Sequence, residues 1–195
     1  MAKISLEGAG RFSYQYPRLV VIVTSHAKGK DNAMTAAWHS PISIKPPLYG
    51  IAISPRRSTY ELILEGKEFG VNFLPFEKAE LMAALGGSRG KEINKFERFH
   101  IAKEKALKTK VPLLEDAYAA YECKLIDHKV YGDHEWIVGQ IVATHILEEA
   151  FTADGVLDVA RFNPPLYLSG DFYLTTQKDT LQRLDRQVYG RRSGD

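Results

Sequence analysis

Cysteine is almost absent from this sequence. Cys123 is the single cysteine among 195 residues. One thiol cannot form a disulfide within the chain, and it cannot supply a cysteine-rich zinc site. We therefore expect the chain to fold by burying a hydrophobic core, for which its length is sufficient, and to work in the reducing cytoplasm.

Long apolar runs are also missing. No stretch approaches the ~20 apolar residues of a membrane span, so we expect no membrane partner. The opening segment, MAKISLEGAGRF, lacks the apolar centre of a secretory signal. Charge of one sign is not in excess either, because 26 Lys and Arg against 24 Asp and Glu leave a formal +2. This balance argues against nucleic acid as a partner.

The sequence contains no complete phosphate-loop, dinucleotide or metal motif. The run GGSRGK at 86–91 fails as a phosphate loop, because only three residues separate Gly86 from Gly90 and Glu92 replaces the required Ser or Thr. No G-x-G-x-x-G follows a strand pattern, so a Rossmann site is not supported. The six histidines form no H-x-x-x-H pair, and we expect no metal site.

Short apolar runs separated by turn residues dominate the pattern. The runs that predict strands are residues 18–24, 48–54, 69–74, 118–130, 136–147 and 166–174. The turn at 131–133 predicts that the two longest runs form an antiparallel hairpin. Short helices are expected at 58–66, 77–85 and 92–99, the first from a capping box made by Ser58 and Glu61. Many strands with few helices predict a mainly β fold, a barrel with helical decoration.

The C-terminal segment carries a weaker pattern. Leu181, Leu184 and Val188 fall on one face of a helix. We expect a domain over residues 1–175 and a helical extension over 176–195. Such a face is buried either on its own domain or against a second copy of the chain.

The most informative segment is DNAMTAAW at 31–38, which follows a strand and a polar turn expected at 26–32. We expect a loop of small residues whose unpaired N–H groups can lie against a planar heterocycle. Asn32 offers an amide, Met34 a soft contact, Thr35 a hydroxyl and Trp38 a flat wall. The alternative is an ordinary loop between strands with a tryptophan in the core.

The run NAMTAAW, preceded by VIVTSHAKGKD, resembles the flavin reductase-like family, the flavoredoxin-type FMN-binding split β-barrels. Further similarities follow in the family's order over residues 12–175. They are the segments PPL at 46–48, RRST at 56–59, FGVN at 69–72, 87–96, YGDH at 131–134, and PLY with Gly170 at 165–170.

This resemblance implies an FMN site. The positions that match its ring-binding residues are Asn32, Ala33, Met34, Thr35 and Trp38. The positions that match its phosphate-binding residues are Ser54, Arg56, Ser58, Thr59 and Lys95. His134 is expected to approach the flavin ring, and Leu166 and Tyr167 to border its face. The alternatives of Lys91 for Lys95 and Arg57 for Arg56 stay open.

These residue types suit the two ends of FMN. The phosphate is nearly dianionic and needs charge-assisted hydrogen bonds, which hydroxyls and cations at a helix N-terminus supply. Reduction places negative charge at the pyrimidine end of the ring, where backbone N–H groups of 32–35 or His134 can stabilise it. A hydride from NADH or NADPH goes directly to the ring, so no protein nucleophile is required.

The function implied by the resemblance is that of an NAD(P)H-dependent flavin reductase-like oxidoreductase, or of a flavoredoxin in electron transfer. Its acceptor would be free flavin, a ferric complex or a redox protein, and its assembly a homodimer. Two alternatives are a non-redox FMN-binding protein and a barrel that binds single-stranded nucleic acid. The second would use the basic segment 89–110, where eight Lys and Arg accompany three Glu.

Overall fold

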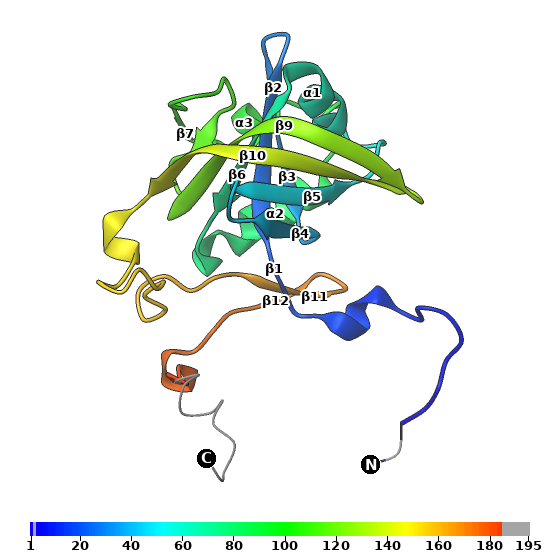
Figure 1. Ribbon diagram of the computed structural model, residues 1–195, viewed down its shortest axis with the longest axis vertical. Coiled ribbons are helices and arrows are strands. Elements are labelled where there is room, and N and C mark those ends of the chain that lie inside the picture. The colour runs from blue at the N-terminus through cyan, green and yellow to red at the C-terminus, as the bar shows by residue number, and fades with distance from the viewer. Residues whose placement is uncertain (2, 185–195) are drawn as a thin grey trace.

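A seven-stranded antiparallel sheet forms most of the molecule and curls into a barrel (Figure 1). The computed structural model describes every residue except Ala2 and 185–195. The strands follow the order β3-β2-β6-β9-β10-β5-β4. Their bounds are β2 Val21–Ala27, β3 Lys30–Ala36, β4 His39–Ser43, β5 Leu48–Ile53, β6 Glu68–Phe73, β9 Ala119–Tyr131 and β10 His134–Ile146. This architecture confirms the mainly β prediction, including the hairpin of the two longest strands.

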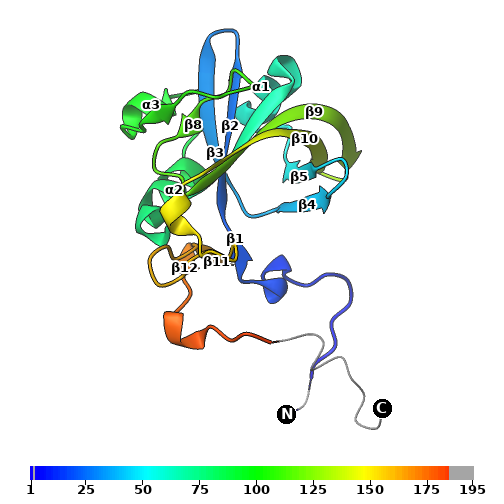
Figure 2. The same cartoon turned by 60° about the vertical axis from the view of Figure 1, so that its left-hand side comes forward.

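The other strands of the described residues form two smaller sheets. One joins β1 Arg18–Leu19, β11 Leu166–Ser169 and β12 Phe172–Leu174, and the other pairs β7 Lys103–Glu104 with β8 Leu113–Leu114. Figure 2 shows the first of these below the barrel. The single strand expected over 166–174 is wrong. Gly170 and Asp171, with φ of 59° and 65°, form the tight turn of a hairpin there.

The helices are short, as expected, and differ in their bounds. They are α1 Ser58–Gly66, α2 Ala79–Gly87 and α3 Lys95–Arg98, with 3-10 turns at η1 Phe12–Gln15, η2 Phe76–Lys78, η3 Glu148–Ala150 and η4 Lys178–Thr180. The expected capping box is wrong. Arg57 is the N-cap of α1 and makes no side-chain cap bond. Glu61 instead accepts from the Lys91 ammonium at 2.6 Å.

The segment after the first long strand is a strand rather than a loop. Ala27 pairs with Lys30, so the polar turn is only Lys28-Gly29, both with positive φ. Residues 32–35 pair with residues 25–22 of β2 across the hairpin. The two-residue turn returns the chain at once and fixes the register of the hairpin.

The core lies on both faces of the sheet, because successive side chains of β2 point to opposite sides. Val21 and Val23 enter the barrel, whereas Ile22 packs under α2 and α3. Cys123 is fully buried inside the barrel. Burial raises the pKa of its thiol, so this residue is a core side chain.

Residues after the last strand do not form the expected helix in the described range. Residues 181–184 carry no helical assignment, and Leu181 and Leu184 are exposed. Val188 lies outside the described residues. None of the helices in the described ranges has the length and hydropathy that crossing a membrane requires.

A buried carboxylate ties the segment after β7 to the barrel. Glu122 of β9 is fully buried and accepts hydrogen bonds from the backbone of Leu107, Lys108 and Thr109 and from the His145 ring. Burial opposes its ionisation, but the hydrogen bonds from His145 and the segment prevail and lower the pKa of Glu122 to about 2.

We predict that Glu122→Gln destabilises the fold at pH 7 by about 2–4 kcal/mol, because an amide cannot accept all these bonds. A folded-state pKa below the ordinary value means that Glu122 stabilises the protein above pH 4.5. The wild-type protein loses this contribution as the pH falls toward 2. In urea unfolding, the free energy of unfolding of Glu122→Gln should not show this dependence on pH. Glu115→Gln, at an exposed site, is the control.

Candidate functional site

Strand β3 is one edge of the seven-stranded sheet, so only one of its flanks is paired with another strand of that sheet. The Ala33 carbonyl points away from β2, toward the open edge of the sheet. There it accepts a hydrogen bond from the Lys95 ammonium at 3.0 Å. In a strand the N–H and C=O of one residue point the same way, and this direction alternates along the chain. Asp31, Ala33 and Thr35 therefore present their backbone groups at the open edge, where a ligand or another chain can pair with them.

Lys95 of α3 is the most unusual cation of the site, because only 3% of its surface is exposed. Its Nζ donates to the Ala33 carbonyl and, at 2.9 Å, to the Leu85 carbonyl near the end of α2. Burial and then the positive charge of Arg57 lower the pKa of Lys95 to about 8. Among the described residues, no carboxylate lies within ion-pair distance of Lys95 or Arg57. Two neighbouring cations without a counter-charge favour a bound anion.

The N-terminus of α1 lies beside this pair. Thr59 is buried, and its hydroxyl accepts from the Asn32 side-chain amide at 2.8 Å. Ser58 is half-buried at the first helical position, where backbone N–H groups lack partners within the helix. The preceding turn is closed by Arg57 N donating to the Ser54 carbonyl at 3.0 Å. The structure thus brings the predicted Ser54, Ser58 and Thr59 to one helix end, next to Asn32.

A large groove of 960 Å³ opens beside this helix end, between the β2–β3 hairpin, α1 and residues 90–97. Three of the four lysines that line it are paired with carboxylates, and Lys30 is the fourth. Lys91 pairs with Glu61 at 2.6 Å, Lys103 pairs with Asp31 at 2.9 Å, and Lys28 pairs with Glu65. Lys91 is therefore exposed and paired, whereas Lys95 is buried without a counter-charge. This contrast favours Lys95 over the alternative Lys91 as an anion ligand.

Trp38 and His134 meet beyond the other end of β3. Their ring centroids are 4.9 Å apart, and the Trp38 indole N–H donates to the Tyr16 hydroxyl at 2.9 Å. His134 Nδ1 lies 2.8 Å from the Asp133 carboxylate. The hydrogen bond and charge of His134, with a smaller contribution from Arg56, lower the pKa of Asp133. Trp38 and His134 are thus in contact, and Arg56 lies close enough to influence Asp133.

Leu166 and Tyr167 lie in strand β11, in the layer of residues behind Trp38. Strand β11 pairs them with Leu19 and Arg18 of β1. The Tyr167 ring lies 6.0 Å from that of Tyr16, the residue that accepts from Trp38. Tyr167 therefore supports the wall made by Trp38 through this tyrosine, and Leu166 is its neighbour in β11.

Two predicted side chains are committed elsewhere. Met34 points into the barrel core, and Thr35 donates its hydroxyl to the Met82 carbonyl of α2 at 2.5 Å. The expectation of a soft contact from Met34 and a free hydroxyl from Thr35 is wrong for these side chains. The period of two along β3 directs Met34 inward and Thr35 toward α2. Ala33 and Thr35 can reach a ligand at the open edge through their backbone atoms.

Sequence reasoning missed Tyr16 and treated Arg57 only as an alternative. Tyr16 belongs to an alternation of Phe12, Tyr14 and Tyr16, which was the one available indication of an aromatic segment near the site. Arg57 lies close enough to Lys95 to lower its pKa. No sequence spacing relates these two residues, because helix α1 and helix α3 meet only in the fold.

Comparisons with known proteins identify the family and agree with the fold. The family model described as "Flavin reductase like domain" matches residues 13–175. An uncharacterized protein of Pyrococcus abyssi is 32% identical over 162 residues, which cover 83% of this chain and 92% of the relative. A ferric-chelate reductase (NAD(P)H) of Archaeoglobus fulgidus is 28% identical over 130 residues, 66% of this chain and 76% of the relative.

Solved structures show the same fold. The FMN-binding protein from Thermus thermophilus, solved with bound 1-cyclohex-2-enone, is 30% identical and superposes with a TM-score of 0.83. The match covers 94% of this chain and all of that one. Flavoredoxin from Methanosarcina acetivorans also has a TM-score of 0.83, at 23% identity, over 98% of this chain and 100% of its own.

We predict that Thr59→Val destabilises the protein by about 1–3 kcal/mol, because the buried Asn32 amide loses its acceptor. Thr59→Ser keeps the hydroxyl and should retain most of this stability. Urea unfolding of both variants measures the difference. Equal stability of the valine and serine variants would contradict a role for the hydroxyl.

Proposed function

The chain belongs to the flavin reductase-like family, and on this premise we propose that it is an FMN-binding oxidoreductase that takes hydride from NADH or NADPH. Its electrons pass to free flavin, to a ferric complex or to a redox protein, as in a flavin reductase or a flavoredoxin. The observation that carries the proposal is the buried Lys95, which faces Arg57 with no counter-charge among the described residues.

The donors around Lys95 fit the phosphate of FMN. The ammonium has three N–H groups, of which two are engaged by the Ala33 and Leu85 carbonyls. Arg57 adds a guanidinium, and the first turn of α1 at Ser58 and Thr59 adds backbone N–H groups. We propose that these groups, with Ser54 and Arg56 from the preceding turn, bind the phosphate.

The open edge of β3 fits the planar ring. The backbone of Ala33 and Thr35 can donate to and accept from the polar rim of a flavin, and Asn32 lies at the phosphate end. When bound, FMN supplies two-electron chemistry by accepting hydride at N5. Trp38, supported through Tyr16 by Tyr167, forms a wall that excludes water from one side of the ring, and Leu166 and Tyr167 border the flavin face.

His134 is the residue that we propose to act near the ring. A carboxylate only accepts hydrogen bonds, so the contact with Asp133 places a proton on His134 Nδ1. This leaves Nε2 as the ring nitrogen available to the flavin, and the His134 ring lies against Trp38. Asp133 thereby fixes the tautomer and the orientation of the His134 ring beside the proposed flavin position.

We also propose a homodimer in the cytoplasm. Large apolar side chains are exposed on β4 and just beyond it, at Ile42 and Ile44, and on the N-terminal segment, at Ile4 and Phe12. Exposed apolar side chains on two separate segments favour burial against a second copy. The division into a domain at 1–175 and an extension at 176–195 is part of this proposal. A monomeric mass by light scattering would count against the dimer.

The nucleic-acid alternative has less support in the fold. In the basic segment 89–110, Arg89, Lys91 and Lys103 form ion pairs with Glu92, Glu61 and Asp31. Paired cations release fewer counterions when they meet phosphates, so they contribute little to such binding.

We expect the purified protein to be yellow, or to become so on titration with FMN. Anaerobic addition of NADH or NADPH should bleach the flavin absorbance. Bleaching distinguishes an oxidoreductase from a non-redox FMN-binding protein. A colourless protein that takes up no FMN would overturn the proposal, and binding to single-stranded DNA that falls steeply with salt would favour the alternative.

We predict that Lys95→Met weakens the binding of FMN at least tenfold. The binding of riboflavin, which lacks the phosphate, should change little. A methionine fills the buried site without charge. Lys91→Met is the matched control, because Lys91 is exposed and paired with Glu61. Fluorescence titration measures both ligands, and retained riboflavin binding shows that the variant is folded.

The same lysine makes the binding pH-dependent. Its pKa of about 8 predicts that FMN affinity falls as the pH rises through this value and Lys95 loses its proton. The phosphate stays doubly ionised throughout, since its second pKa is about 6. Lys95→Met should show no such fall between pH 7 and 9. A wild-type affinity that is flat over this range would contradict the assignment.

A further inference from the structure

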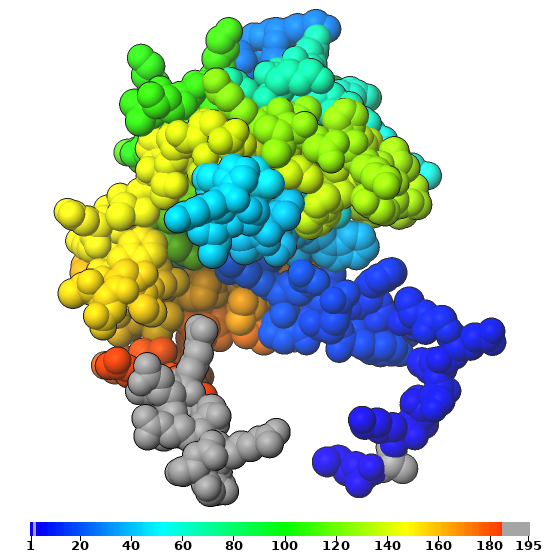
Figure 3. Space-filling model, in the orientation of Figure 1, coloured from blue at the N-terminus to red at the C-terminus, as the bar shows by residue number. Residues whose placement is uncertain are grey.

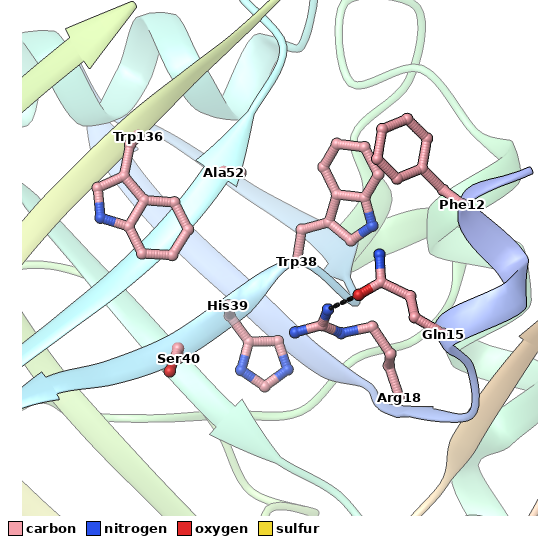
Figure 4. Close-up of a pocket in the computed structure, with 8 residues that line it drawn as sticks. All are labelled: Phe12, Gln15, Arg18, Trp38, His39, Ser40, Ala52 and Trp136. Atoms are coloured by element: carbon pink, nitrogen blue, oxygen red, sulfur yellow. Dashed lines mark hydrogen bonds between the residues drawn. The ribbon is translucent and has the colours of Figure 1, made fainter. Parts of the chain in front are cut away.

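A second, smaller pocket lies next to Trp38, on the outer face of β4 and β5 (Figure 4). Its volume is 230 Å³, below the roughly 300–1,000 Å³ of pockets that take drug-sized ligands. Its lining is Phe12, Gln15, Arg18, Trp38, His39, Ser40, Ala52 and Trp136. A space of this size suits a single-ring ligand, and four of its eight lining residues carry aromatic rings.

The two indoles of the pocket are held in place before any ligand arrives. Trp136 lies flat on β5 because Gly50 has no side chain; a Cβ there would be 2.2 Å from the Trp136 ring. Trp38 is fixed by its bond to the Tyr16 hydroxyl and by Ala52 N, which donates to its carbonyl at 2.8 Å. Ala52 pairs with Trp136 across the strands, and its small side chain leaves the space beside the indole open. Flat, fixed aromatic walls favour a planar ring.

The polar side of the pocket is positive. Arg18 donates from Nη1 to the Gln15 side chain at 3.1 Å, which holds the guanidinium beside the indole of Trp38 (Figure 4). No carboxylate in the described part of the chain lies within ion-pair distance of Arg18. Four of its five N–H groups have no protein acceptor among the described residues, and a guanidinium matches a carboxylate in a bidentate fork.

His39 adds no charge of its own to the pocket. The Leu19 carbonyl can only accept, so the 3.0 Å contact places a proton on His39 Nε2. The Tyr49 hydroxyl lies 2.7 Å from Nδ1 and donates to it. Burial, with a smaller contribution from the charge of Arg18, lowers the pKa of His39, and the ring is neutral at pH 7. Arg18 is therefore the one formal charge in the lining.

We propose that this pocket binds a planar aromatic monocarboxylate. The ring lies against Trp38 and Trp136 over Ala52, and the carboxylate pairs with Arg18. The pocket shares Trp38 with the proposed flavin site but uses none of the phosphate ligands. Such a ligand would be held next to the redox ring, as a substrate or as an inhibitor.

Benzoate is the probe, titrated by calorimetry into the full-length protein as purified. We expect benzoate to bind more tightly than benzamide, which lacks the charge, and than cyclohexanecarboxylate, which lacks the flat ring. Arg18→Gln should weaken benzoate at least tenfold and leave benzamide unchanged. Arg18→Lys should recover part of the affinity, because an ammonium keeps the charge without the fork.

Ala52→Leu tests the position of the ring independently, because it fills the space and leaves Arg18 intact. It should abolish benzoate binding. Arg11→Gln is the matched control, since Arg11 is exposed and outside the lining. FMN binding should survive in all of these variants, which separates this proposal from that of the flavin site. Benzoate that binds no better than benzamide, or that binds Arg18→Gln and Ala52→Leu as well as wild type, would overturn it.

Discussion

The arrangement of the site depends on one buried ammonium. Lys95 joins three elements, because its Nζ binds the Ala33 carbonyl of β3 and the Leu85 carbonyl of α2 while its own backbone belongs to α3. A buried cation with only neutral acceptors is costly, and the depressed pKa of Lys95 reflects this cost. A structural anchor alone would not require a charge at this place. An anion beside Lys95 and Arg57 would offset the desolvation, which links the stability of this corner to ligand binding.

The edge position of β3 is the second constraint. An unpaired strand edge is a hazard in a soluble protein, because it can pair with other chains. Here part of that edge is covered by Lys95 and by α2, to which Thr35 donates. The barrel thus keeps a short length of β3 backbone unpaired beside the two cations Lys95 and Arg57. A flat heterocycle with an anionic tail matches both features, which is why the fold and the proposed cofactor suit each other.

Trp38 connects the two candidate sites. Its indole contacts His134, which we place near the flavin, and also lines the small positive pocket with Arg18 and Trp136. Its orientation is set by Tyr16, from the segment before the barrel. The N-terminal segment, part of which lies under the barrel in Figure 3, therefore sets the position of a side chain that belongs to both candidate sites.

The sequence alone determined the strand-rich class, the long hairpin and, through the NAMTAAW run, the family. These follow from local pattern, since alternation and turn residues act over a few positions. It failed on residues 32–35, where a two-residue turn converted an expected loop into a paired strand. Only the tertiary structure buried Lys95 while pairing Lys91 with Glu61, committed Met34 to the core, and set Arg18 in one pocket with two tryptophans. The environment of each of these side chains depends on burial and on contacts between segments that are distant in the sequence. The spacing of residues along the chain predicts neither.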